Sequence, residues 1–361
     1  MRAAPAVPAS RLVSLDAFRG LTMAAMVLVN NPGTWGAVYA PLRHADWHGL
    51  TPTDVVFPCF VFIVGVAIAL SPPTPGRVLR RAAIIFVLGI VLNGAPYFDW
   101  STLRIPGVLQ RIAVCYLVAA LLFLGTRWRT QIAVTAALLL GYWALLTLVP
   151  VPGYGRGDLG PEGNLAAWVD RAVLGRPHLW KAARVYDPEG ILSTLPAIAT
   201  ALLGVLTGQW LQSGRDPRRI VAGLTVVGAI AAVLGMAWGI VLPVNKTLWT
   251  SSYVLLTGGL ALLLFAACYW ATDVRGWRRW TAPWVVFGVN ALLLFFLSTL
   301  MARTLTLIHV GPVTLQRAIF DGAFAPWASP INASLAYAIA YLLFWWLVLW
   351  ALYRAGIRLR A

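Results

Sequence analysis

Long apolar runs constrain this 361-residue chain more than any other feature of its sequence. A run of about 20 mostly apolar residues is long enough to cross a bilayer as a helix. We find ten such runs, at residues 12–31, 52–71, 78–95, 107–125, 130–150, 191–212, 219–242, 249–272, 283–303 and 333–355. The pattern therefore predicts an all-α integral membrane protein with about ten transmembrane helices, forming one domain over residues 1–361.

Composition excludes the main alternatives to a membrane protein. The chain is 60% hydrophobic and 11% charged, whereas a soluble domain is about 45–50% apolar and about 25% charged. Three cysteines in the whole chain exclude a disulfide scaffold. The net charge of +16 would suggest nucleic acid in a soluble protein, but membrane proteins concentrate Lys and Arg in cytoplasmic loops. We expect no nucleic-acid partner.

Basic residues alternate between the two sides of the predicted spans. One side holds Arg2, Arg11, Arg77, Arg80, Arg81, Arg127, Arg129, Arg215, Arg218, Arg219, Arg275, Arg278, Arg279, Arg354, Arg358 and Arg360. The short loops on the other side hold single basic residues. The positive-inside rule then predicts that both termini are cytoplasmic, with an even number of spans. Heavy use of Arg and Ala is typical of a GC-rich bacterial genome, so we expect a bacterial inner membrane. We expect no signal peptide, because MRAAPAVPAS is too short and polar to supply an apolar core.

Titratable side chains gather on the opposite, predicted periplasmic side. All four histidines fall there: His44, His48, His178 and His309. The long loop at 151–190 lies on the same side, and we expect it to be ordered because Trp168, Trp180 and Tyr186 can pack.

The densest polar cluster is LRHADWHGLTPTD, residues 42–54. It contains His44, Asp46, Trp47, His48 and Asp54. Imidazole suits proton transfer near neutral pH and can also accept an acyl group as a nucleophile. Three plainer interpretations stay open: His48 and Trp47 as interfacial anchors, His44 as an ordinary loop residue, and a zinc site. An H-x-x-x-H spacing without further ligands is a weak metal pattern, so we predict no metal.

Polar residues inside or beside the other spans mark further candidates. Asp16 and Arg19 share one helix face in the first span, as a structural ion pair or as a site for an anionic ligand. The remaining candidates are Gln110 and Arg111 in RIPGVLQRI, Asp187 and Glu189 in YDPEG, Asn245, Lys246, Trp249 and Ser251 in PVNKTLWTSSY, and the buried amide Asn290. Capping of a helix N-terminus competes with a functional role for the two YDPEG acids.

Several long motifs together carry a family resemblance. In order they are SLDAFRG (14–20), VNN (29–31), RHADWHGLTPTDVVFPCFVFIVG (43–65), RIPGVLQRI (104–112), YDPEGILSTLPAIATALLGVLTG (186–208), PVNKTLWTSSYV (243–254) and FGVN (287–290). The chain thus resembles the heparan-α-glucosaminide N-acetyltransferase family, in its short bacterial form. The resemblance implies a transmembrane acyltransferase. In the family, acetyl-CoA comes from the cytosol and the acetyl group reaches a glucosamine amine across the membrane.

The resemblance also implies roles for particular residues. The family's active-site histidine lies in H-A-x-W-x-G, which places it at His44, and the asparagine of the V-N pair corresponds to Asn30. We expect His44 to accept the acetyl group or to deprotonate the amine, Asn30 to hold the thioester oxygen, and Asp54 or Asp46 to orient His44. We assign Arg19, Asp16 and Asn290 to the coenzyme. The acceptor sugar is assigned to Asp46, Trp47, Arg111, Asp187, Glu189, Asn245 and Trp249.

One rival function remains, a secondary transporter for amino sugars, although no internal repeat of the kind common in transporters is visible. The expected partners are acetyl-CoA, an amino-sugar acceptor and membrane lipid. A homodimer agrees with the resemblance, and no residue indicates it.

Overall fold

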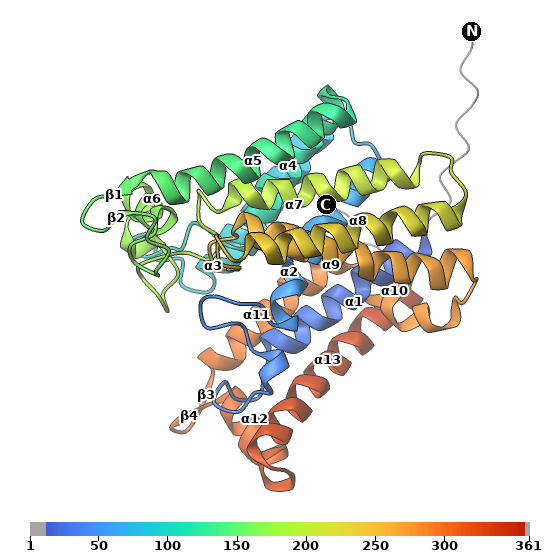
Figure 1. Cartoon of the computed structure of the whole chain (residues 1–361). Coiled ribbons are helices and arrows are strands. Elements are labelled where there is room, and N and C mark those ends of the chain that lie inside the picture. Colours follow the sequence, from blue (N-terminus) through green and yellow to red (C-terminus); the bar gives the residue numbers. More distant parts are fainter. Residues whose placement is uncertain (1–11, 358–361) are drawn as a thin grey trace.

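The computed structural model describes residues 12–357 (Figure 1). Residues 1–11 and 358–361 lie outside that range, and with them Arg2, Arg11, Arg358 and Arg360 and the segment on which the signal-peptide expectation rests. The principal helices are α1 (Val13–Asn30), α2 (Pro52–Leu70), α3 (Pro75–Gly94), α4 (Val108–Gly125), α5 (Trp128–Leu148), α6 (Leu165–Leu174), α7 (Thr194–Leu211), α8 (Pro217–Trp238), α9 (Ser251–Tyr269), α10 (Ala282–Val289), α11 (Ala291–Leu307), α12 (Leu315–Ala323) and α13 (Pro330–Arg354).

Short elements complete the described chain. They are the single turns η1 (Ala40–Leu42), η2 (Arg176–His178), η4 (Arg279–Thr281) and η5 (Ala325–Trp327), and the π-helical η3 (Trp270–Val274) that continues α9. Within residues 12–357 the strands are limited to two antiparallel pairs: β1 (Pro150–Val151) with β2 (Gly155–Arg156), and β3 (His309–Val310) with β4 (Val313–Thr314). The predicted all-α fold class is confirmed.

Among the described residues, eight helices are long and apolar enough to cross a membrane: α1, α2, α4, α5, α7, α8, α9 with η3, and α13. A ninth candidate is the pair Arg279–Val289 and Ala291–Leu307, which is bent by 67° at Asn290 where we expected one continuous span at 283–303. The predicted span at 78–95 coincides with α3. Helix α3 carries Arg77, Arg80 and Arg81 in its first two turns, and these charges exclude it from the helices that qualify as membrane spans by composition. The exact number of spans and their orientation stay predictions.

Helix α2 lies at the centre of the bundle and packs against α1, α4, α7 and α9. Its approach to α7 depends on small residues: a Cβ at Gly65 would overlap the Ala201 carbonyl oxygen, and one at Gly204 would overlap the Phe62 carbonyl oxygen. Close backbone contact of this kind is how helices associate where no water drives them together. The packing fixes α2, and therefore every side chain at its N-terminus.

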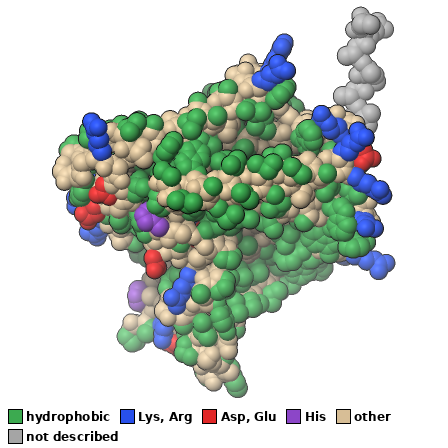
Figure 2. Space-filling view, viewed as in Figure 1, with side chains coloured by type: hydrophobic (Ala, Val, Ile, Leu, Met, Phe, Trp, Pro, Cys, Tyr) green, Lys and Arg blue, Asp and Glu red, His purple; other side chains and the backbone are tan. Residues whose placement is uncertain are grey.

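The two ends of the bundle differ in chemistry. At one end, which we call the histidine end, lie His44, His48, His178 and His309, beside α6 and the β3–β4 turn. At the other, which we call the arginine end, α2 gives way to α3 with Arg77, Arg80 and Arg81. Figure 2 shows a dense group of Lys and Arg at one extreme of this face, and His with most visible acids at the other, where further Lys and Arg also lie, with a largely apolar band between the two ends. This polarity agrees with the predicted orientation.

Candidate active site

His44 and Asp54 form the centre of the site. Asp54 is the third residue of α2, where Pro52 favours helix initiation and Thr51 precedes the first turn. Asp54 Oδ1 lies 2.7 Å from His44 Nδ1. Its Oδ2 accepts hydrogen bonds from Ala45 N at 3.1 Å and from Thr51 N and Oγ1, both at 3.0 Å. Because a carboxylate accepts at Nδ1, the proton of a neutral imidazole belongs there, and Nε2 keeps its lone pair.

The exposure of the pair suits a reacting group held by a buried one. The Asp54 side chain is 1% exposed, whereas that of His44 is 40% exposed. Three main-chain and hydroxyl donors fix the carboxylate, and the carboxylate in turn fixes the ring. The direct contact between Asp54 and His44 supports the expectation that Asp54 orients the ring. Asp46, the other candidate, is exposed and makes no hydrogen bond to that ring among the described residues.

Lys246 also contacts the ring. Its Nζ lies 2.8 Å from His44 Nδ1, 3.2 Å from Nε2 and 3.6 Å from Asp54 Oδ1. Burial lowers the pKa of Lys246, while the charges of Asp54 and Glu189 act in the opposite direction. The sequence pattern placed Lys246 in the PVNKTLWTSSY motif but indicated no role for it and no contact with His44. The available signal was that it is one of very few lysines in an arginine-rich chain.

The segment between α8 and α9 holds Lys246 in place. Asn245 is fully buried, with its Oδ1 accepting from Leu248 N at 2.8 Å and its Nδ2 lying 3.3 Å from His48 Nδ1. Trp249 is buried with φ of 53°, an unusual conformation for a bulky residue. Its Nε1 donates to Thr200 Oγ1 at 3.1 Å. Asn245 and Trp249 thus shape the loop beside His44, and their assignment to the acceptor stays a prediction.

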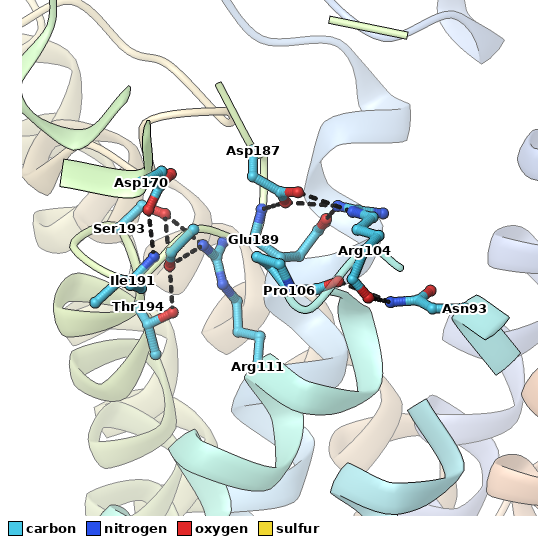
Figure 3. A network of polar contacts seen from close by, with 11 residues as sticks. Asn93, Arg104, Pro106, Arg111, Asp170, Asp187, Glu189, Ile191, Ser193 and Thr194 are labelled. Atoms are coloured by element: carbon cyan, nitrogen blue, oxygen red, sulfur yellow. Dashed lines mark hydrogen bonds and ion pairs between the residues drawn. The ribbon is translucent and has the colours of Figure 1, made fainter. Parts of the chain in front are cut away.

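A salt-bridge network lies at the same end (Figure 3). Arg104 Nη2 lies 2.6 Å from Asp187 Oδ1 and 2.5 Å from Glu189 Oε2, and Arg104 Nε donates to Asp187 Oδ2 at 2.8 Å. The two acids raise the pKa of Arg104 despite its burial. The Arg104 carbonyl accepts from Asn93 Nδ2 at 3.0 Å. Sequence reasoning assigned the two acids to the acceptor and did not single out Arg104, a lone arginine in a loop.

Arg111 lies beside that network and is 2% exposed. Its Nη2 donates to Gly190 O and to Ser193 Oγ, and its guanidinium lies 5.0 Å from the centre of the Trp249 ring. Nε and Nη1 are buried and have no hydrogen-bond partner within residues 12–357. Through these hydrogen bonds and the Trp249 ring, the buried cation links the end of the YDPEG segment to the Lys246 loop.

The segment 151–190 is folded, as we expected. Trp47 Nε1 donates to Leu159 O at 2.8 Å, and the Trp47 ring meets the Tyr186 ring edge-on at 5.0 Å between centres. Asp170 on α6 is buried and accepts from Ile191 N at 2.8 Å. Burial raises the pKa of Asp170 to about 7. Trp47 therefore ties the His44 loop to this segment.

A cavity of about 550 Å³ opens between α1, α2, α4 and the α10–α11 bend. Its walls are largely apolar, and its polar lining includes Asp16, Arg19 and Arg81. A neighbouring cavity of about 380 Å³ shares Arg81 and adds Arg77 and Arg80. Helix α2 lines the first cavity from Phe60 to Leu70. Phe60 is roughly 9 Å along the axis from Asp54.

Of the three predicted coenzyme residues, Asp16 and Arg19 line this cavity, whereas Asn290 lies between the lining residues Val289 and Ala291 and does not itself line it. Arg19 Nη1 lies 3.3 Å from Asp16 Oδ1 and 3.4 Å from the Gly288 carbonyl oxygen. Asn290, at the bend between α10 and α11, is buried and donates to Ile357 O at 3.2 Å. Asn30 is the exposed last residue of α1, whose earlier turns line the cavity to Met26, and it makes no hydrogen bond to His44 in the described structure.

In the region from residue 12 to residue 357, no three His, Cys, Asp or Glu side chains are grouped so that they would hold an ion. His44 faces Asp54 and Lys246, and His48 faces Asn245.

Fold and site together define a multi-pass membrane protein with an imidazole–carboxylate pair at one end of its bundle and an arginine-lined cavity entering from the other. The family model described as heparan-alpha-glucosaminide N-acetyltransferase, catalytic, matches residues 11–236. The chain belongs to this family, which confirms the resemblance carried by its motifs.

Two relatives show the extent of the similarity. The heparan-alpha-glucosaminide N-acetyltransferase of Mus musculus is 31% identical over 357 residues, covering 80% of this chain and 53% of the relative. That of Homo sapiens is 33% identical over 353 residues, covering 79% of this chain and 52% of the relative. The chain thus spans about half the length of these relatives.

Proposed function

We propose that this protein is a membrane acetyltransferase that moves the acetyl group of acetyl-CoA onto the amine of a glucosamine-type sugar. Family membership supports the reaction class. The observation that carries the proposal is that one helix, α2, holds Asp54 against His44 and also lines the cavity that reaches the arginine end. A transporter requires no such pairing of a reacting imidazole with a cavity for a long anionic ligand.

The coenzyme enters from the arginine end, which is the cytosolic side in this proposal. Its phosphates meet Arg19, Arg77, Arg80 and Arg81, since guanidinium groups bind phosphate through charge-assisted hydrogen bonds. Its pantetheine arm occupies the apolar cavity, and the thioester comes to the inner end near Phe60 and Met26. Asn30, one turn beyond Met26, contributes a donor there, and Asp16 and Asn290 hold Arg19 and the bend in place.

The acceptor binds at the histidine end, on the periplasmic side. Its amine approaches His44 Nε2, which either removes the amine proton or first takes the acetyl group. Exposed Asp46 and half-buried Trp47 offer contacts to the sugar. The acceptor site is lined at its base by five further residues: Asp187, Glu189, Arg111, Asn245 and Trp249.

The protein is a single transmembrane domain of the bacterial inner membrane in this proposal. The exposed apolar face of α8, which includes Val226, Val227 and Ile230, suits contact with lipid. A homodimer is part of the proposal on family grounds alone.

The test is an acetyl-CoA assay with a panel of amino sugars, comparing wild type with His44→Ala. His309→Ala is the matched control, because His309 is an exposed residue of β3 whose Nδ1 lies 2.9 Å from Leu307 O and which makes no hydrogen bond to Asp54 in the described residues. We expect transfer by wild type and the control, and loss in His44→Ala. Undiminished transfer by His44→Ala would remove the mechanism. Thermal stabilisation of the purified protein by CoA separates the proposal from the amino-sugar transporter, which has no reason to bind CoA.

A further inference from the structure

Lys246 is the charged side chain in contact with the part of His44 that reacts. Its Nζ lies 2.8 Å from Nδ1, and 3.2 Å from Nε2, the ring nitrogen that keeps its lone pair because Asp54 accepts at Nδ1. An ammonium has three donors, and the recorded contacts of this one are with the ring and, at 3.6 Å, with Asp54. Lys246 therefore has a donor to offer a group that arrives at Nε2.

We propose that Lys246 is a catalytic residue whose ammonium group stabilises the negative charge that develops on the acetyl oxygen during transfer. The inference rests on the proposed function and deepens it. It gives this role to a residue 202 positions from His44 in the chain.

The geometry is independent of which chemical route is taken. If His44 acts as a base, the amine nitrogen bonds to the thioester carbon, its proton passes to Nε2, and the carbonyl electron pair moves to oxygen. If His44 acts as a nucleophile, Nε2 itself bonds to that carbon with the same displacement. In the first route, collapse re-forms C=O, breaks the C–S bond and releases CoA, whose sulfur takes the proton from Nε2. In the second route, collapse leaves the acetyl group on Nε2 and CoA as the thiolate; the amine then bonds to the acetyl carbon, the C–Nε2 bond breaks, and the amine proton passes to the thiolate.

In either route the oxygen lies one C=O bond, about 1.2 Å, from a carbon at or near Nε2. That oxygen can therefore come within hydrogen-bonding distance of Nζ. As it arrives, the ammonium exchanges its contact with Nε2 for one with the oxygen, which also frees the lone pair. Preorganised donors of this kind act most strongly where water is excluded.

Neighbouring donors are less well placed. Arg111 is buried against Trp249 and makes no hydrogen bond with His44 in the described residues, and neither does Asn30. The loop that carries Lys246 is held at Leu248, whose N donates to Asn245 Oδ1 at 2.8 Å and whose carbonyl oxygen accepts from the Tyr142 hydroxyl at 2.5 Å. Because the loop is fixed, the ammonium stays beside His44 when the substrate leaves and does not turn out into solvent.

The experiment compares wild type, Lys246→Met, Lys246→Arg and the control Lys181→Met, an exposed lysine of the 151–190 segment. Loss of one oxyanion donor lowers kcat by about 10²–10³-fold. We expect that loss in Lys246→Met, partial recovery in Lys246→Arg, and no change in Lys181→Met. The KM for acetyl-CoA and the stabilisation by CoA should stay at wild-type values in Lys246→Met, because the cavity lies on other residues.

A pH profile supplies a readout that a structural role would not move. Burial lowers the pKa of Lys246, with Asp54, Glu189, Arg111 and His44 as its charged or titratable neighbours. Activity should therefore fall at alkaline pH as the ammonium is lost, and in Lys246→Arg the fall should move to higher pH, because arginine stays protonated.

Three results overturn the inference. If wild type is active and Lys246→Met keeps full kcat, Lys246 has no catalytic role, and the proposed function is unaffected. Equal loss of activity and of CoA-induced stabilisation in both Lys246 variants assigns the residue a structural role. An inert wild type that binds no CoA removes the proposed function, and this inference with it.

Discussion

Arg104 and Asp187 form a two-point salt bridge, with Nε 2.8 Å from Oδ2 and Nη2 2.6 Å from Oδ1. Asp187 has no exposed side-chain surface, and Arg104 is 18% exposed. Removing one partner of such a pair leaves a buried charge without compensation, which costs about 3–5 kcal/mol. We therefore expect Arg104→Met to lower the free energy of unfolding by about that amount, measured by denaturant unfolding in detergent.

The control for this prediction is Arg156→Met, which removes an exposed arginine on β2 of the same end. It should leave the unfolding free energy within about 0.5 kcal/mol of wild type. Equal stability of the two variants would mean that the Arg104 pair does not stabilise the fold.

Asp54→Asn should abolish most of the activity while leaving the protein folded. The substitution keeps the shape of the side chain, but one carboxylate oxygen becomes an NH2 group that cannot accept a hydrogen bond. At one position this group loses the bond from His44 Nδ1, and at the other it loses the bonds from Ala45 N and Thr51 N. The ring of His44 then loses its fixed orientation, and we expect kcat to fall by roughly 10²-fold or more. Steady-state kinetics beside Asp321→Asn, an exposed acid, provides the check. Wild-type kcat in Asp54→Asn would contradict the orienting role.

The raised pKa of Asp170 should make the free energy of unfolding depend on pH. Its pKa in the folded protein is raised to about 7, whereas an unfolded aspartate titrates near pH 4. Between those values the folded state holds a proton that the unfolded state releases. The free energy of unfolding should therefore decrease as pH rises from about 4 to about 7, by about 1.4 kcal/mol for each pH unit.

Asp170→Asn should flatten that part of the stability curve, since an amide does not titrate. Asp321→Asn, on the exposed face of α12, should preserve it. Identical slopes in wild type and Asp170→Asn would show that another group controls the dependence.

Arg81 tests the coenzyme cavity. It lines both cavities and stacks over the Tyr116 ring at 5.0 Å. Arg81→Gln should weaken CoA binding by about tenfold, because one charge-assisted phosphate contact is lost. Arg129→Gln removes another exposed arginine of the same end, one that does not line either cavity. Calorimetric titration with CoA should find weaker binding in Arg81→Gln alone. Equal affinities in the two variants would place the phosphates elsewhere.

Hydropathy and motif order were sufficient to predict the all-α membrane fold, the positions of the long helices and the family. Apolarity over about 20 residues is a local property, and it selects a helix whatever the rest of the chain does. His44 and Asp54 were also within reach of the sequence, because they share one short segment that ends in the first turn of α2.

The bend at Asn290, the cavity and the contacts of Lys246 and Arg104 were decided only by the tertiary structure. Lys246 meets His44 across 202 positions, and Arg104 meets Asp187 across 83. No local pattern encodes such distances, because they depend on how α2, α4, α7 and α9 pack around one another. The packing also turned Asp187, an acid beside a helix start in the sequence, into the buried half of a salt bridge.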